Sequence, residues 1–353
     1  MKNHLDLYAT GAQALCDLGV KEIPKTYVQP HHQRPNSLNI VRGKQLPLID
    51  LSRLCGDGRN QVMEELRFAC ESWGFFHVIN HGFPQNSMNA MMEVGRQFFE
   101  LPLDVKMRFF HPKPTNVTHY GGSFSSNDEC VSNWRDYLVH PCLPLSDEIV
   151  DTWPDLPPRY REIAKEYSKN VRVLALKLLA LLSESLGLRE SYLDETFKGH
   201  VQLMNINHYP PCPQPDLTLG VNGHTDPNGI TILQQDDVAG LEVLKDGSWY
   251  AVNPVPNSFV INMGDQMQII SNGRYKSIEH RGVVNSEKTR FSIAAFCGPS
   301  YHAIIAPAAE LIKQRPDQSA EYDEVVYGEY VRQIYSKGVN GKYYIDSVKI
   351  QKK

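Results

Sequence analysis

Long hydrophobic runs are missing from the sequence. The longest apolar stretch, around residues 173–182, is interrupted by Lys177. A membrane-spanning helix needs about 20 consecutive apolar residues, so this stretch is too short to cross a bilayer. Residues 1–13 also lack the apolar segment of a signal peptide. We therefore expect a cytoplasmic protein that does not insert into a membrane.

Paired cysteines and an excess of basic charge are missing as well. The seven cysteines are scattered without a Cys-x-x-Cys pair, and the formal net charge is −4. The cysteine pattern argues against a disulfide framework and against a thiolate zinc site. The charge gives no general attraction to nucleic acid or to an anionic membrane. We therefore expect a monomer in a reducing compartment, with a small molecule as its partner.

The chain of 353 residues is long enough for one large domain or two closely packed ones. Residues 46–101 alternate between short apolar strands and helical patterns, residues 111–145 are mostly polar and loop-like, and residues 157–186 predict a helical pair. From residue 201, short strands alternate with turn residues about every 8 to 12 positions, which is typical of a sandwich or barrel.

We predict five segments without a linker or repeat between them. They are an N-terminal helix and arm (1–45), an N-terminal α/β region (46–155), a helical support (156–200), a β-rich core (201–300) and a C-terminal helical tail (301–353). Together they predict a β-sandwich core wrapped by helices.

The stretch NGHTDPNG, residues 222–229, contains two possible metal ligands. His224 and Asp226 share one side of an extended segment, because side chains alternate along a strand. His280, in a β-branched run, is the best candidate for a third ligand. Two imidazoles and one carboxylate leave open positions that suit non-haem Fe(II) and dioxygen. Asn, Asp, Gly and Pro also fill ordinary turns, so the stretch alone does not require a metal.

Two further motifs offer partners for a dicarboxylate. Arg290-x-Ser292 follows His280 in the next predicted strand. An arginine fork binds a carboxylate through two hydrogen bonds, and a nearby hydroxyl adds a donor. Upstream, Asn207-x-Tyr209 places an amide and a phenol on one strand face. These groups suit a dicarboxylate that chelates the metal at one end and contacts the arginine at the other.

Several motifs resemble the plant 2-oxoglutarate- and Fe(II)-dependent dioxygenase family, in the correct order from about residue 46 to beyond residue 300. They include PLIDLS, ACESWGFFHVINHG, NHYPPCPQPDLTLGVNGHTDPNGITILQQD and YKSIEHRGVVNSEKTRFSIAAF. The motifs NWRDYL, HTDPN and TILQQD are most similar to the downy-mildew-resistance-type branch, which includes salicylate hydroxylases and flavone synthases I.

The resemblance implies a mainly β fold, with a double-stranded β-helix (jelly-roll) core flanked by an N-terminal α/β region and a C-terminal helix. It implies Fe(II), 2-oxoglutarate and O2 as cofactor and co-substrates, with ascorbate as reductant. The iron ligands that it implies are His224, Asp226 and His280. The residues that it implies around 2-oxoglutarate are Tyr209, Arg290, Ser292 and, as a brace, Asn207.

The resemblance also implies that a ferryl intermediate oxidises a substrate C–H bond while 2-oxoglutarate becomes succinate and CO2. We expect hydroxylation or desaturation of an aromatic plant specialised metabolite, with a flavonoid-like molecule as first choice. A salicylate-type phenolic acid and an alkaloid are the alternatives. Aromatic walls suit such flat substrates, and the candidate pocket residues are Phe296, Tyr120, Phe124 and Asn205.

Three other functions stay open on the sequence. An oxidase of the same fold would use the arginine and serine for a different carboxylate. A ligand-binding protein would keep the fold with an inactive metal site. A zinc hydrolase would also use two histidines and a carboxylate, but it needs a nearby general base that the sequence does not identify.

Overall fold

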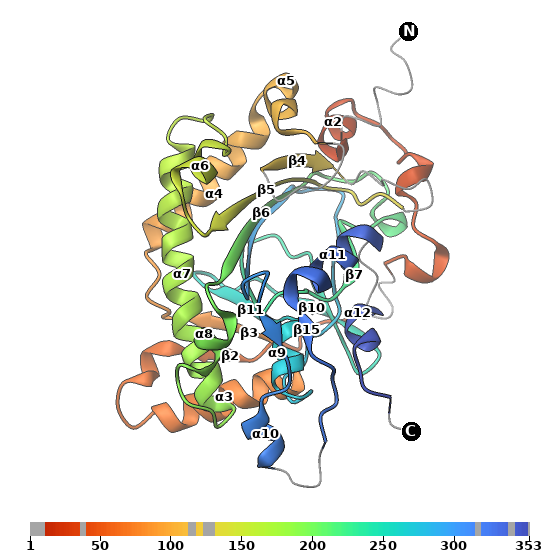
Figure 1. Ribbon diagram of the computed structural model, residues 1–353. Coiled ribbons are helices and arrows are strands. Elements are labelled where there is room, and N and C mark those ends of the chain that lie inside the picture. The colour runs from red at the N-terminus through yellow and green to blue at the C-terminus, as the bar shows by residue number, and fades with distance from the viewer. Residues whose placement is uncertain are drawn as a thin grey trace.

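The computed structural model describes residues 11–35, 40–111, 118–122, 131–314, 319–337 and 343–351. In this part of the chain, an eight-stranded sheet and a five-stranded sheet form a sandwich with helices around it (Figure 1). A third, two-stranded sheet consists of β14 (Ile304–Ile305) and β15 (Val325–Val326). None of the described helices is long and apolar enough to cross a membrane.

The eight-stranded sheet is antiparallel except where β2 pairs with β3 at its edge. In spatial order its strands are β2 (Leu48–Asp50), β3 (Phe75–Ile79), β11 (Phe259–Met263), β8 (Ile230–Gln235), β13 (Arg290–Gly298), β6 (Val201–Tyr209), β5 (Asp136–Leu143) and β4 (His119–Gly122). Directly opposed residues of neighbouring strands share one face of a sheet. One face of this sheet points to the second sheet, and the other points to helices.

The five-stranded sheet is shorter and carries two of the predicted metal ligands. In spatial order its strands are β1 (Ile40–Val41), β10 (Ser248–Val252), β9 (Leu241–Lys245), β12 (His280–Gly282) and β7 (Val221–His224). Strands β12 and β7 are antiparallel, and their register places His280 opposite His224.

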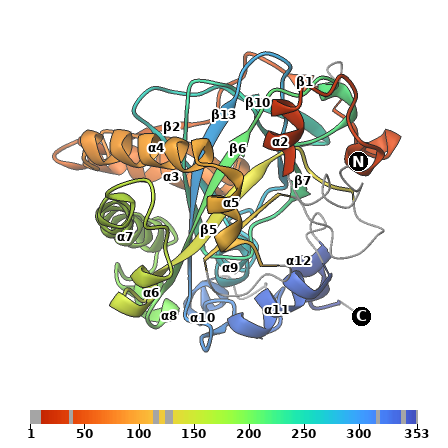
Figure 2. The same ribbon diagram turned by 90° about the horizontal axis from the view of Figure 1, so that it is seen from above.

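Three long helices, α3 (Arg59–Ser72), α4 (Gln85–Glu100) and α7 (Tyr160–Ser185), lie together on one side of the sandwich (Figures 1 and 2). The C-terminal helices α11 (Tyr327–Lys337) and α12 (Tyr343–Ser347) lie away from them. The remaining short helices are α2 (Gly11–Asp17), α5 (Leu103–Lys106), α6 (Asp147–Asp151), α8 (Tyr192–Phe197), α9 (Asp265–Ile270) and α10 (Ala309–Lys313).

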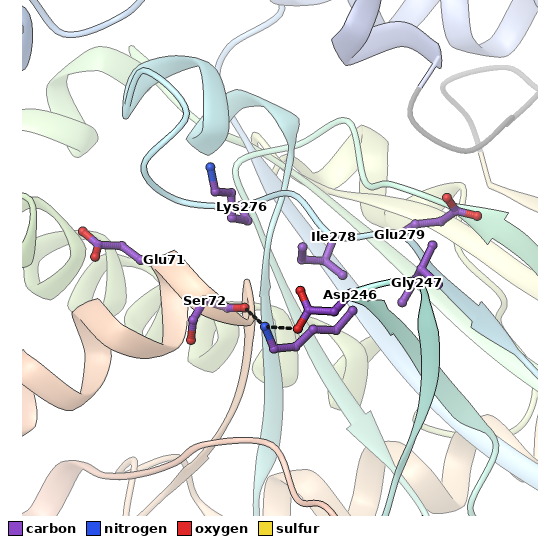
Figure 3. Close-up of a pocket in the computed structure, with 9 residues that line it drawn as sticks. Glu71, Ser72, Asp246, Gly247, Lys276, Ile278 and Glu279 are labelled. Carbon is purple, nitrogen blue, oxygen red and sulfur yellow. Dashed lines mark hydrogen bonds and ion pairs between the residues drawn. The ribbon is translucent and has the colours of Figure 1, made fainter. Parts of the chain in front are cut away.

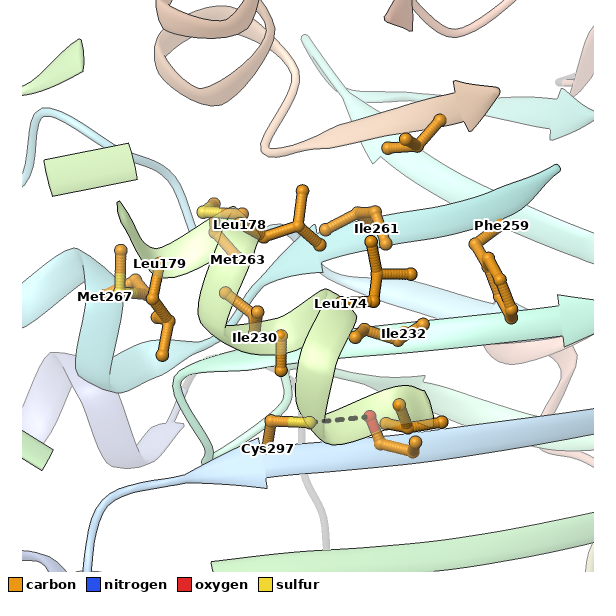
Figure 4. Packing of buried hydrophobic residues seen from close by; sticks show 14 of the residues in the cluster. Leu174, Leu178, Leu179, Ile230, Ile232, Phe259, Ile261, Met263, Met267 and Cys297 are labelled. Atoms are coloured by element: carbon orange, nitrogen blue, oxygen red, sulfur yellow. Dashed lines mark hydrogen bonds between the residues drawn. The ribbon is translucent and has the colours of Figure 1, made fainter. Parts of the chain in front are cut away.

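Helix α7 supplies much of the apolar layer that covers the eight-stranded sheet. Leu174 and Leu178 are four residues apart and therefore lie on the same helix face. Figure 4 shows them beside Ile232 and Ile261, which are directly opposed on β8 and β11. All four side chains are buried. Each buried side chain of this size contributes about 1.5–3 kcal/mol through removal of apolar surface from water.

The structure agrees with the predicted fold class and differs from the sequence patterns in two places. Residues 157–186 form one long helix, α7, instead of a helical pair. The loop-like stretch 111–145 contains β4 and β5, which extend the large sheet. The buried face of β5 includes the polar residues Asp136 and His140, so hydrophobicity alone does not reveal this strand. The five segment boundaries stay a prediction.

Candidate metal centre and co-substrate site

Three predicted ligands come together between the two sheets. His224 ends β7, His280 begins β12, and Asp226 follows β7 by two residues. One ligand atom from each lies within 4.8 Å of the others. Oδ1 of Asp226 is 3.5 Å from Nε2 of His224 and 3.6 Å from Nε2 of His280. These distances leave space for one cation among three donor atoms.

The hydrogen bonds of both histidines leave the correct nitrogen free for a metal. Nδ1 of His224 is 2.9 Å from the carbonyl oxygen of Asn222, and Nδ1 of His280 is 3.1 Å from that of Ile278. A carbonyl oxygen can only accept, so each Nδ1 carries the proton. Each Nε2 therefore presents a lone pair, which is the arrangement that a second hydrogen bond imposes on metal-binding histidines.

Asp226 is oriented by a hydrogen-bond network rather than by a strand. Its Oδ2 accepts from Oγ1 of Thr231 at 2.5 Å and from Nδ2 of Asn262 at 2.8 Å. Its carbonyl oxygen accepts from the backbone N–H of Asp265 at 2.8 Å. The two side chains come together as expected, but β7 ends at His224, so strand alternation is not what places Asp226. The network leaves Oδ1 free to face the histidines.

The charges of this cluster favour an anionic carboxylate at Asp226 and a neutral imidazole at His280. Burial alone raises the pKa of Asp226, but His280 and His224 and the hydrogen bond from Thr231 together lower it well below the usual range. Burial, and then the neighbouring His224, lowers the pKa of His280 to about 4. Metal binding requires these same protonation states, so the donor set fits a divalent cation.

The predicted dicarboxylate anchor lies on the face of the large sheet that points to the five-stranded sheet. Arg290 is directly opposite Tyr209, and Ser292 is directly opposite Asn207. The guanidinium carbon of Arg290 is 5.0 Å from the centre of the Tyr209 ring. The structure thus brings all four residues of the predicted anchor together.

Arg290 is a buried cation that forms no direct ion pair with a described carboxylate, although its charge acts on the nearby Asp236. Arg290 is 3% exposed, and its Nη2 donates to the neutral Oε1 of Gln235 at 3.0 Å. Its Nε has no hydrogen-bond partner. A buried charge without a direct ion pair is costly, so this position suits a ligand carboxylate. Among the other arginines, Arg281 is equally buried but pairs with Glu242 at 2.8 Å.

Two of the four predicted pocket residues lie on the same face as the anchor. Phe296 is on β13 with Ser292, and Asn205 is on β6 with Asn207. Each pair is separated by an even number of positions along its strand, so its two side chains lie on the same face of the sheet. Oδ1 of Asn205 is buried and has no partner, which leaves it available to a ligand.

The other two predicted pocket residues are not placed beside the anchor. Tyr120 belongs to β4 and is opposite Leu138, on the face that points to the helices. Its ring centre is 6.0 Å from that of Phe98, within the apolar core. This placement does not support a substrate contact for Tyr120. Phe124 lies outside the described residues.

The sequence patterns missed several residues that shape the site. Thr231 and Asn262 orient Asp226, and Arg135 and Tyr137 lie beside Asn207, as described below. The motif NWRDYL, residues 133–138, indicated a resemblance to a family branch but predicted no site residue. Once residues 136–143 are recognised as a strand, the alternation places Tyr137 on the face of Asn207.

A separate surface pocket is lined mostly by charged side chains (Figure 3). Nζ of Lys245 donates to the carbonyl oxygen of Ser72 at 2.9 Å and lies 3.2 Å from Oδ2 of Asp246. The pocket shares no residue with the His–Asp–His cluster or with the dicarboxylate anchor. It is therefore separate from the candidate site.

Comparison with known proteins agrees with this geometry. Residues 200–299 match the 2OG-Fe(II) oxygenase superfamily, and residues 46–159 match the family described as "non-haem dioxygenase in morphine synthesis N-terminal". Protein DOWNY MILDEW RESISTANCE 6 of Arabidopsis thaliana is 41% identical over 327 residues, which cover 92% of this chain and 95% of that protein. Flavanone 3-dioxygenase 2 of Oryza sativa subsp. japonica is 42% identical over 325 residues, which cover 92% and 93%.

A solved structure extends the likeness to the whole fold. The crystal structure of JOX2 in complex with 2OG, Fe and JA has a TM-score of 0.87 and 34% sequence identity, and the match covers 97% of this chain and 98% of that chain. The predicted jelly-roll class and the predicted branch resemblance are both confirmed. The chain therefore belongs to the 2OG-Fe(II) oxygenase superfamily and is an oxidoreductase that uses Fe(II), 2-oxoglutarate and O2.

Proposed function

We propose that His224, Asp226 and His280 are the ligands of the Fe(II) ion. The observation that carries this proposal is the convergence of their three ligand atoms within 4.8 Å. The two histidines keep Nε2 free, and Asp226 keeps Oδ1 free. Two nitrogens and one oxygen on one side of a cation leave the opposite side for co-substrates.

Arg290, Ser292 and Tyr209 hold the distal carboxylate of 2-oxoglutarate in this proposal. The unpartnered Nε of Arg290 supports it, together with the direct opposition of Arg290 and Tyr209. A charge-assisted pair between arginine and carboxylate fixes both position and orientation. Asn207 braces this row, since it lies opposite Ser292 on the neighbouring strand.

Fe(II), 2-oxoglutarate and O2 together supply the oxidation of a substrate C–H bond, with release of succinate and CO2. The chain itself orients the reactants. Phe296 and Asn205, on the face of the anchor, form part of the wall that positions the substrate. The aromatic ring excludes water, and the amide oxygen accepts a hydrogen bond from a hydroxyl group.

The substrate in this proposal is an aromatic specialised metabolite that is hydroxylated or desaturated. A flavonoid-like molecule is supported by the name of the relative Flavanone 3-dioxygenase 2. A phenolic acid of the salicylate type is the second candidate, and an alkaloid is the third. The His–Asp–His cluster and the anchor favour an active oxygenase over an inactive binding protein. The ligand atoms of the cluster converge as a metal requires, and Arg290 keeps an unpartnered donor for a carboxylate.

A substrate panel tests this proposal. The purified chain is supplied with Fe(II), 2-oxoglutarate, O2 and ascorbate, and flavanones, phenolic acids and alkaloids are added in turn. Succinate is quantified, and the product mass is determined. A gain of one oxygen indicates hydroxylation, and a loss of two hydrogens indicates desaturation. Product formation without succinate would refute the use of 2-oxoglutarate, and would favour an oxidase of the same fold.

The state of the protein in the cell completes the proposal. We infer that it acts as a cytoplasmic monomer on a small molecule, without nucleic acid or membrane as a partner. The net charge of −4 and the scattered cysteines support this inference. Light scattering of the purified chain tests the monomer, and a dimer mass would contradict it.

A further inference from the structure

A second arginine lies on the inner face of the large sheet, close to the co-substrate anchor. Nη1 of Arg135 donates to Oδ1 of Asn207 at 2.8 Å. Its guanidinium carbon is 5.0 Å from the centre of the Tyr137 ring. Tyr137 is directly opposite Asn207, and Asn207 is directly opposite Ser292. Arg135 therefore contacts the anchor directly at Asn207, and strand β6 lies between Arg135 and the strand that carries Arg290 and Ser292.

Arg135 has more donors than partners. A guanidinium carries five N–H donors. Among the described residues, Asn207 is the one acceptor for the Arg135 side chain. Its Nε is buried and has no partner. No described carboxylate forms an ion pair with Arg135, whereas Arg281 pairs with Glu242. Asp136, the next residue, points to the other face of the sheet, where it accepts from the backbone N–H of Ala12 at 2.8 Å.

Tyr137 offers a second donor beside Arg135. The backbone N–H of His111 donates to Nδ1 of His119 at 3.2 Å, so this nitrogen is unprotonated. Burial lowers the pKa of His119 to about 4, so the ring is neutral and carries its proton on Nε2. That proton is donated to the hydroxyl oxygen of Tyr137, 3.3 Å away. The hydroxyl proton of Tyr137 is then left for another acceptor.

Gly121 makes this arrangement possible. A Cβ atom at position 121 would lie 2.9 Å from Nε2 of His119 and 3.3 Å from the hydroxyl oxygen of Tyr137. Contacts this short would push the two rings apart. The backbone of β4 therefore approaches the His119–Tyr137 pair as closely as a glycine allows.

We propose that Arg135 and Tyr137 bind a carboxylate group of the substrate. This proposal rests on the proposed function and narrows its substrate class from aromatic metabolites in general to aromatic carboxylic acids. It favours the phenolic acid over the neutral flavonoid. Arg290 and Arg135 then divide the recognition of anions: Arg290 binds the co-substrate, and Arg135 binds the substrate. Arg135 and Tyr137 determine specificity and do not take part in the oxidation itself.

Equilibrium binding with matched acids and amides tests the proposal without turnover. The probes are benzoate, 2-hydroxybenzoate and 4-hydroxycinnamate, each compared with its neutral amide. The protein is the full chain with Mn(II) and 2-oxoglutarate bound. We expect at least one acid to bind more tightly than its amide, and Arg135→Gln to weaken that acid roughly 10- to 100-fold while leaving the amide unchanged.

Conservative variants separate charge from structure. Arg135→Lys keeps the charge and should retain part of the affinity for the acid, although it loses the planar fork. Tyr137→Phe should cost the acid a smaller factor, because it removes one neutral donor. Arg189→Gln, on an exposed arginine that pairs with Glu195, is the matched control and should change nothing. Circular dichroism confirms that each variant is folded.

Two results would overturn the proposal. The first is that no acid binds more tightly than its amide, or that Arg135→Gln weakens both equally. The second is a parallel loss of 2-oxoglutarate affinity in Arg135→Gln, which would show that Arg135 serves the co-substrate through Asn207. Failure of the proposed function looks different. It would leave selective binding of the acid intact, while Fe(II) and 2-oxoglutarate yield no succinate with any substrate.

Discussion

The two faces of strand β13 have opposite characters although they belong to the same nine residues. Phe291, Ile293 and Ala295 point to the helices and lie in the main apolar core. Arg290 and Ser292 point to the second sheet and belong to the proposed co-substrate anchor. The alternation of side chains along a strand separates these two sets. One face therefore stabilises the fold, and the other carries residues of the proposed reaction site.

We call the face of the large sheet that points to the second sheet the inner face, and the face that points to the helices the outer face. Residues of the inner face lower the stability of the free protein, and the apolar packing of the outer face compensates for this. Several buried polar atoms without a partner lie on the inner face, including Oδ1 of Asn205, Nε2 of Gln235 and Nε of Arg290. Each such atom costs about 1–3 kcal/mol in the free protein. Ligand binding returns this free energy, because the ligand supplies the missing partners. Substitutions on the two faces should therefore change different quantities.

The largest effect is expected for His280→Ala on the inner side. Loss of a residue that only hydrogen-bonds to a metal ligand costs roughly 10- to 100-fold. Removal of His280, a proposed ligand itself, should therefore lower turnover by more than this. The free energy of unfolding of the metal-free protein should fall less than in the Phe291→Ala variant below, because the ring packs edge-on against Phe75 but lies outside the main apolar core. Bound iron is measured by inductively coupled plasma mass spectrometry, and succinate by chromatography.

The exposed His302 offers a control for that variant. His302→Ala should keep both iron and turnover. If His280→Ala bound iron stoichiometrically and kept its turnover, the assignment of His280 as a ligand would be wrong.

Phe291→Ala should produce the opposite result on the outer side. Phe291 is completely buried, and its ring centre is 6.0 Å from that of Phe99. Loss of the ring leaves a cavity and should lower the free energy of unfolding by about 3–5 kcal/mol. The kcat of the folded fraction should stay within about twofold. Urea denaturation followed by fluorescence measures the stability.

Phe296 on the same strand is the matched comparison for Phe291. Phe296→Ala should cost less stability, because this side chain is outside the main apolar core, and should raise the KM of the substrate. Equal losses of stability in the two variants would contradict the division between the faces.

Thr231→Val tests whether a residue of the inner face that does not itself bind the metal affects the affinity for Fe(II). The hydroxyl of Thr231 donates to Oδ2 of Asp226 at 2.5 Å, and valine keeps the shape while removing this donor. The affinity for Fe(II) should fall about 10- to 100-fold, which competition with a chelating dye measures. Thr218 is buried and its hydroxyl has no partner, so Thr218→Val should leave the affinity unchanged. Equal affinity in both variants would refute the role of Thr231.

The sequence predicts those features that depend on local pattern. Strand alternation and spacing identify Arg290, Ser292, Asn207 and Tyr209, and the structure places them together. Asp226 shows the limit of this reasoning, because its orientation depends on Asn262, which is distant in the sequence. Strand β5 was missed for a related reason. Asp136 is buried against helix α2, and a polar residue with distant partners carries no hydrophobic signal.

The smallest effect is expected where the C-terminal helix meets the metal centre. The hydroxyl of Tyr330 on α11 donates to Oδ2 of Asp265 at 2.7 Å, and the backbone N–H of Asp265 donates to the carbonyl oxygen of Asp226. Asp265 also accepts from Oγ of Ser277 at 2.6 Å, so it keeps a strong partner without Tyr330. Tyr330→Phe should therefore lower the free energy of unfolding by about 1 kcal/mol.

The iron affinity distinguishes two roles for α11 in the Tyr330→Phe variant. If the helix only covers the sandwich, the affinity stays within about twofold of the wild-type value, since the backbone bond between Asp265 and Asp226 does not need the tyrosine. A tenfold loss of affinity would place α11 among the elements that hold the metal loop. The part of the molecule that supports iron binding would then include helix α11 as well as the inner face of the large sheet.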